Sequence, residues 1–234
     1  MGILRRFLRN VLPIGILVLC ATFARAQDPE MLRHFDYDRK APLGIKHIGV
    51  QRRAQAVVYD LTYASPKGGV VPAYLVVPKG RGPFAAIVWG HWCWSNSSMR
   101  NRNQFLDEAL ALAQTGVVSL LTDHPISRPG YVQVKDPLDE RNATNFLHQV
   151  IDMQRGVDLL KARRDVDPKR IAYVGHSCNA AVGALLSGLV RRFKAFVLMA
   201  GSLSDEINAQ TKGYQEFRQK VGAEKLDALV AKYS

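Results

Sequence analysis

The sequence contains little cysteine, no internal repeat and only one long apolar run, and each shortage excludes a class of protein. Three cysteines in 234 residues are too few for the disulfide framework of a small secreted domain, and no CxxC pair offers a structural zinc site. The absence of a repeat of about 20–50 residues argues against a solenoid or propeller. Hydrophobic residues make up 47% and charged residues 22% of the chain, which is typical of a globular protein.

The apolar run lies at the extreme N-terminus and predicts an export signal. Three arginines precede an apolar stretch over residues 11–23, and Ala24-Arg25-Ala26 has the small-x-small pattern of a cleavage site. The stretch is short for a membrane span and contains Pro13. We therefore predict a signal peptide over residues 1–26 and a periplasmic or secreted protein with no stable membrane association after cleavage. An uncleaved anchor is the alternative.

The net charge of +12 falls when the predicted signal is removed, because that segment holds four arginines and no acid. The remainder has 28 basic and 20 acidic residues, and its basic residues occur singly or in pairs. No aromatic–basic motif accompanies them, so we interpret the charge as a solvated surface and predict no nucleic-acid partner.

Residues 27–53 are polar and are predicted to form an irregular N-terminal arm, followed by one domain over residues 54–234. Two β-like runs, 54–63 and 70–77, flank a turn at 65–69 that contains proline and two glycines, and together they predict an antiparallel hairpin.

Buried strands and helices alternate after the hairpin. Continuous apolar runs predict strands over residues 84–89, 117–121, 171–174 and 194–200. Apolar spacing predicts helices over 105–112 and 146–160, and further helices from Cys178 and over 205–234. The polar loop over 125–140 is long enough to shape a site. The order predicts an α/β fold: a mostly parallel sheet with an N-terminal antiparallel hairpin and helices on both faces.

The strongest local signal for chemistry surrounds Ser177. A predicted buried strand leads into Gly175-His176-Ser177-Cys178-Asn179, and a helix of small residues follows. A sharp turn there would project the hydroxyl above the sheet edge and direct the Cys178 N–H at a developing oxyanion. The pattern is G-x-S-x-G with Asn179 in place of the second glycine. Ser177 is the candidate nucleophile, and an incidental serine in a strand-to-helix loop is the alternative.

The loop after the strand at 84–89 is the second signal. It reads Gly90-His91-Trp92-Cys93-Trp94, and in this architecture it supplies the other oxyanion donor. The backbone N–H groups of Trp92 and Cys93 are the candidates, with Cys178 as their partner. The tryptophans could equally pack the edge of the sheet.

These motifs resemble those of the α/β-hydrolase superfamily, particularly its dienelactone-hydrolase-like and prolyl-oligopeptidase-like esterases and peptidases. The resemblance runs from residue 54 to 200 and rests on residues 70–78, 83–91, 164–171 and 175–179. It implies an eight-stranded sheet, a serine nucleophile and a small-molecule substrate with an ester, thioester or peptide bond. We predict no cofactor, and no residue pattern indicates a metal site.

The resemblance also implies an acid and a histidine after the nucleophile, yet all six histidines precede Ser177. Asp205 follows the last predicted strand, but two further strands and a histidine loop are not found. His91 and His124 follow buried strands at the expected active edge and are the candidates for an unorthodox base. We weigh three hypotheses: a hydrolase chain truncated at its C-terminus, which is favoured; a non-catalytic binding protein; and a complete hydrolase with an unorthodox base.

The fold would also bring Cys93 and Cys178 into one small region. A disulfide needs Cα atoms about 4.4–6.8 Å apart, and the two loops approach within or just beyond that window. We expect neighbouring sulfurs, with two buried thiols favoured over a bond.

Overall fold

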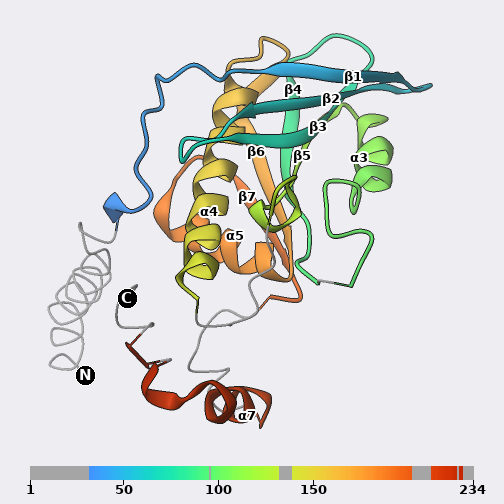
Figure 1. The fold of residues 1–234 in the computed structure, drawn as a ribbon. Coiled ribbons are helices and arrows are strands. Elements are labelled where there is room, and N and C mark those ends of the chain that lie inside the picture. The colour runs from blue at the N-terminus through green and yellow to red at the C-terminus, as the bar shows by residue number, and fades with distance from the viewer. Residues whose placement is uncertain (1–31, 95, 132–138, 202–211, 226, 229–234) are drawn as a thin grey trace, which may run out of the picture. The chain divides into compact units, whose positions relative to one another are not determined.

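The computed structural model describes residues 32–94, 96–131, 139–201, 212–225, 227 and 228 (Figure 1). The predicted signal peptide, Asp205 and residues 132–138 of the predicted site-shaping loop lie outside these residues. Residues 37–233 form one compact unit, separate from residues 1–36. The tail contains a helix, α7 (Lys212–Val221), as predicted. Within the described ranges, no helix has the length and apolar character needed to cross a bilayer.

A seven-stranded sheet forms the centre of the described fold, in the order β1-β2-β3-β5-β4-β6-β7. The three pairs from β1 to β5 are antiparallel, and the three pairs from β5 to β7 are parallel. The expectation of a mostly parallel sheet therefore holds only for its second half. The strands are β1 (Lys46–Arg52), β2 (Ala56–Ala64), β3 (Val70–Pro78), β4 (Phe84–Gly90), β5 (Val117–Thr122), β6 (Val166–His176) and β7 (Ala195–Met199).

The register of the parallel strands brings three loops together. Gly90 at the end of β4 pairs with Thr122 at the end of β5 and with Gly175 near the end of β6. The carboxyl ends of these strands therefore lie side by side at one edge of the sheet. Ligands bind at such edges in open α/β sheets.

Helices cover both faces, as predicted (Figure 1). The helices around the sheet are α3 (Leu106–Ala113), α4 (Glu140–Lys161) and α5 (Cys178–Leu189), with a short 3₁₀ helix, η1, at Pro125–Ser127. On β5, Leu121 joins the core under α3, whereas Leu120 contacts α4 at Gly156. Consecutive strand residues point to opposite faces, so α3 and α4 lie on opposite sides.

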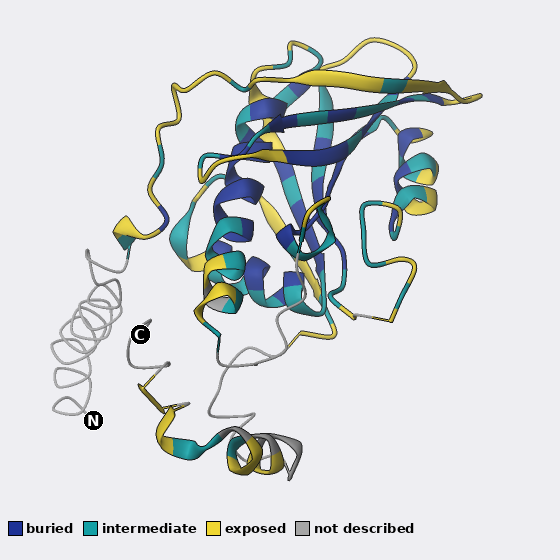
Figure 2. Ribbon diagram, in the orientation of Figure 1, coloured by how far each residue is buried: buried dark blue, intermediate teal, exposed yellow. Residues whose placement is uncertain are grey.

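The irregular arm predicted for residues 27–53 is wrong over residues 46–52, which form β1. This strand pairs antiparallel with β2, and six of its seven residues are exposed (Figure 2). The sequence did not indicate it because a strand exposed on both faces has no apolar alternation, and its stability comes from main-chain hydrogen bonds to β2.

The other edge of the described sheet is β7, which pairs with β6 alone. Val197 is 51% and Leu198 36% exposed there. The resemblance implied eight strands, and the described residues form seven.

Candidate functional site

Ser177 forms a strained turn between β6 and α5. Its backbone has φ 56° and ψ −117°, and only one other non-glycine residue in the described ranges, Ala200, has a positive φ. Such a conformation costs about 1–3 kcal/mol and persists where the surroundings hold it. The Ser177 N–H donates to the Met199 carbonyl over 2.8 Å, and its carbonyl accepts from the Ala180 N–H over 2.9 Å.

The Ser177 side chain is left available by this turn. The residue is partly exposed, and its hydroxyl does not cap α5. Within the described part of the chain the hydroxyl makes no hydrogen bond to a protein group. A partly exposed hydroxyl on a strained strand-to-helix turn has the geometry of a nucleophile elbow.

Asn179, which replaces the second glycine of the motif, connects the elbow to two other elements. Its side chain is fully buried, and its Nδ2 donates to the His91 carbonyl over 2.5 Å. Its Oδ1 accepts from Nε2 of Gln149 on α4 over 2.9 Å. The amide therefore has a structural use here that glycine could not supply.

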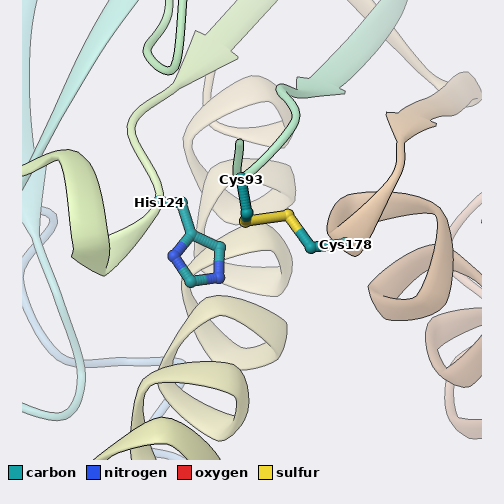
Figure 3. A group of neighbouring side chains, drawn as sticks. All are labelled: Cys93, His124 and Cys178. Atoms are coloured by element: carbon teal, nitrogen blue, oxygen red, sulfur yellow. A yellow bond between two sulfur atoms is a disulfide. The ribbon is translucent and has the colours of Figure 1, made fainter. Parts of the chain in front are cut away.

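Cys93 and Cys178 form a disulfide, with Cα atoms 5.9 Å apart (Figure 3). The expected proximity of the two sulfurs is confirmed, and the favoured alternative of two free thiols is wrong. The bond joins the loop after β4 to the first residue of α5, directly beside Ser177. The two loops that border the site are therefore covalently linked.

The three predicted oxyanion donors differ in their partners. The Trp92 N–H donates to Oε1 of Gln104 over 2.7 Å. Nε2 of the same glutamine is 2.6 Å from Nδ1 of His176. By contrast, the backbone N–H groups of Cys93 and Cys178 donate to no residue that the structure describes. These two amides, on the two sides of the disulfide, therefore have no protein partner among the described residues.

His91 is buried, and both of its ring nitrogens have partners. Nδ1 lies 2.6 Å from the Trp92 carbonyl, and Nε2 accepts from the His124 backbone N–H over 3.0 Å. This pairing places the proton of the neutral ring on Nδ1. Burial lowers the pKa of His91 from 6.5 to about 4, so the ring is neutral at pH 7.

His124 lies beside the disulfide, and its ring is at the Cys93 end of the bond, away from Cys178 (Figure 3). Its Nδ1 accepts from the Ile126 N–H over 3.3 Å, so the proton of the neutral ring lies on Nε2. Burial lowers the pKa of His124 well below its ordinary value. The lone pair that a base would need is therefore engaged in each of the two histidines.

A ring nitrogen of His124 and the sulfurs of Cys93 and Cys178 lie within 4.8 Å of one another. That spacing would suit a metal ion, but a metal binds the thiolate form of cysteine. Because the two sulfurs are bonded to each other, these three residues do not offer a metal site in the oxidised protein.

Sequence reasoning missed Gln104, Asn179 and Gln149 as supports of the site. Asn179 could have been found, since it departs from the glycine of the motif. Gln104 carries no such signal: it lies 72 residues from His176 in sequence, and only the folded chain brings them together.

No family model matches the chain, and no curated protein matches it either. Solved structures do. An acetyl xylan esterase from Paenibacillus sp. R4 aligns with a TM-score of 0.64 at 20% identity, over 89% of this chain and 73% of that one. Acetyl xylan esterase 1 from Thermoanaerobacterium sp. JW/SL YS485 gives 0.61 at 20% identity, over 81% and 64%. A glucuronoyl esterase from Solibacter usitatus gives 0.51 at 15%, over 76% and 58%. The chain thus spans less than two thirds of the latter two proteins, and these identities establish a shared fold alone.

Proposed function

We propose that the chain, which has the α/β-hydrolase fold, is a serine hydrolase that acts on ester bonds, with Ser177 as the nucleophile. The observation that carries the proposal is the strained backbone of Ser177, at φ 56° and ψ −117° between β6 and α5. A serine held in this conformation with an unused hydroxyl has a functional explanation and no evident structural one.

The backbone N–H groups of Cys93 and Cys178 are proposed as the oxyanion hole. Both lack a protein partner among the described residues, and the disulfide fixes one relative to the other. Trp92, the third candidate, gives its N–H to Gln104 and is therefore disfavoured. Preorganised donors of this kind are worth about 2.7–4 kcal/mol of transition-state stabilisation each.

The proposed reaction has two steps. Oγ of Ser177 forms a bond to the ester carbonyl carbon while its proton passes to a base, and the carbonyl electrons move to the oxygen held by the two amides. Collapse of this intermediate releases the alcohol, which takes the proton, and leaves an acyl-enzyme. Water then attacks the acyl carbon, the bond to Oγ breaks, and the carboxylic acid leaves while Oγ regains its proton.

The base is proposed to lie outside these 234 residues. His91 and His124 already use their lone pairs to accept backbone N–H groups, and no histidine follows Ser177 in the sequence. A serine hydroxyl is a weak nucleophile without a positioned base. We therefore expect this chain alone to hydrolyse esters poorly, and expect activity when a C-terminal segment of a longer relative is added.

An ester carried by a carbohydrate is proposed as the substrate. Several solved structures that share the fold are named as esterases of this kind, among them the two acetyl xylan esterases. A polymeric carbohydrate is met outside the cytoplasm, which agrees with the export signal predicted over residues 1–26. We propose a periplasmic or secreted location on that basis.

A non-catalytic carbohydrate-binding protein is the second candidate. The engagement of both His91 and His124 favours it, because a site that has no base can still bind a ligand. The two candidates differ in whether Ser177 reacts.

Fluorophosphonate labelling followed by intact-mass measurement separates them. The hydrolase proposal predicts one adduct per chain, mapped to Ser177 and absent in Ser177→Ala. Ser187→Ala, an exposed serine on α5, is the matched control and is expected to label normally. No adduct at Ser177, even after prolonged incubation, would overturn the hydrolase proposal.

A further inference from the structure

Trp94 is the most exposed large hydrophobic residue of the loop after β4. It is 63% exposed, whereas Trp89, five residues earlier, is 5% exposed in the core. Burial of a tryptophan removes about 150–250 Å² from water, so an indole left in solvent gives up a large stabilisation.

The position of Trp94 is tied to the proposed nucleophile. Trp94 follows Cys93, Cys93 is bonded to Cys178, and Cys178 follows Ser177. Consecutive Cα atoms lie about 3.8 Å apart, and the bridged pair 5.9 Å, so the Cα atoms of Trp94 and Ser177 are within about 13.5 Å of each other. Trp94 therefore lies on the loop that the disulfide joins to the residue after Ser177.

The Trp94 indole is also held in place by neighbouring aromatic rings. It packs edge-on against Trp92, with ring centroids 5.6 Å apart and planes at 82°. Trp92 in turn lies over His176, at 5.2 Å and 31°, and Gln104 holds both of these residues through hydrogen bonds. A side chain held in this way loses little conformational freedom when a ligand binds.

The surroundings of Trp94 favour a sugar ring over an apolar ligand. The described part of the loop between Trp94 and α3 is mostly polar, with Ser98 and Asn103 exposed, and its one other exposed large apolar residue is Met99. A long acyl chain or a protein partner would require a wider apolar patch. A pyranose ring requires one flat apolar surface for its C–H face and polar groups for its hydroxyls.

We propose that Trp94 is a stacking platform for a sugar ring of the substrate, next to the ester that Ser177 attacks. The proposal rests on the proposed function, and it adds a binding subsite with a named residue and ligand class. Binding of a sugar at Trp94 does not require a catalytic base, so it can be measured in the chain as it stands.

The test is titration of the Ser177→Ala chain with xylotetraose, cellotetraose and chitotetraose by isothermal calorimetry. We expect millimolar or tighter binding of at least one of them, weakened about tenfold or more by Trp94→Ala and largely kept by Trp94→Phe. Met99→Ala is the matched control and is expected to change affinity less than twofold. Each variant is first checked for an unchanged thermal midpoint.

Two results would overturn the platform. One is equal affinity of the parent chain and Trp94→Ala for the sugar that binds. The other is binding of no oligosaccharide to the parent chain; Trp94-dependent binding of p-nitrophenyl octanoate would then assign the indole to an acyl chain. Neither bears on whether Ser177 reacts with a fluorophosphonate, so the two proposals fail separately.

Discussion

The side chain of Asn179 occupies the space that a side chain at Gly90 would need. A Cβ atom on Gly90 would lie 2.6 Å from Cβ and Cγ of Asn179. Gly90, the last residue of β4, therefore leaves room for the side chain of Asn179, the residue that replaces the second glycine of the elbow. Helix α5 comes close to the sheet at this point because the small residue is on β4.

This relationship predicts strong coupling between the two positions. Gly90→Ala is expected to destabilise the protein by about 1–3 kcal/mol through overpacking. In an Asn179→Gly background the same change should cost less, since the atoms that it meets are gone. A double-mutant cycle by urea unfolding measures the difference, expected to be about 1 kcal/mol or more.

Gly188→Ala on α5 is the control for that cycle, because a Cβ there meets no atom within 4 Å. It is expected to leave stability unchanged or slightly increased. If Gly90→Ala lowers the free energy of unfolding equally in the parent and in Asn179→Gly, Asn179 does not fill this space.

The disulfide predicts a second measurable effect. Cys93 and Cys178 are 85 residues apart in sequence, and a bridge over a loop of this length typically stabilises a protein by about 2–5 kcal/mol. Cys93→Ser and Cys178→Ser should each lower the free energy of unfolding by that amount, and the double variant should lose little more than either. Thiol titration of denatured protein that begins at Gln27 should find no free thiol; two would contradict the bond.

The buried histidines predict a loss of stability in mild acid. Burial lowers the pKa of His91 from 6.5 to about 4 and that of His124 in the same direction. The unfolded chain therefore binds these protons at a higher pH than the native chain does. The stabilisation is complete above about pH 6.5 and decreases as the pH falls toward 4, by up to about 1.4 kcal/mol per pH unit for each histidine.

Urea unfolding at pH 7.5, 6.0 and 5.0 measures this dependence. His91→Gln is expected to be less stable than the parent at pH 7.5 and to have a shallower slope between pH 6.5 and 4. A parent chain whose stability is constant over that interval would contradict the buried, neutral state of His91.

Export is predicted by the N-terminal sequence. Cleavage after Ala26 would give a protein that begins at Gln27, and N-terminal sequencing of material from the periplasm or medium measures this directly. Arg25→Pro, next to the cleavage site, is expected to block processing. Recovery of the full-length chain only in the inner membrane would instead support an anchor.

The sequence predicted the elements whose pattern reflects burial. Residues 84–89 read as a buried strand because both faces of β4 are covered, and the spacing of apolar residues gave the centre of α4. The sequence did not predict β1, because this strand is exposed and is held by main-chain hydrogen bonds to β2. In the site too, a local sequence pattern could be predicted, whereas contacts between distant elements could not.

Ser177 could be predicted because its motif is local, whereas its supports could not. The hydrogen bonds of Gln104 and Asn179 join elements that are distant in sequence, and they depend on register and rotamers. The engagement of the Trp92 N–H and of the ring nitrogens of His91 likewise follows from loop geometry that no spacing rule specifies.

Chemical rescue by imidazole tests the central claim most directly, namely that Ser177 is a nucleophile without its base in this chain. The rate of fluorophosphonate labelling at Ser177 is measured by intact mass at 0–100 mM imidazole, with Ser177→Ala as the blank. We predict slow labelling that accelerates in proportion to imidazole, because the added base takes the serine proton. Fast labelling that is indifferent to imidazole and abolished by His124→Ala or His91→Ala would contradict the account and assign the base to this chain.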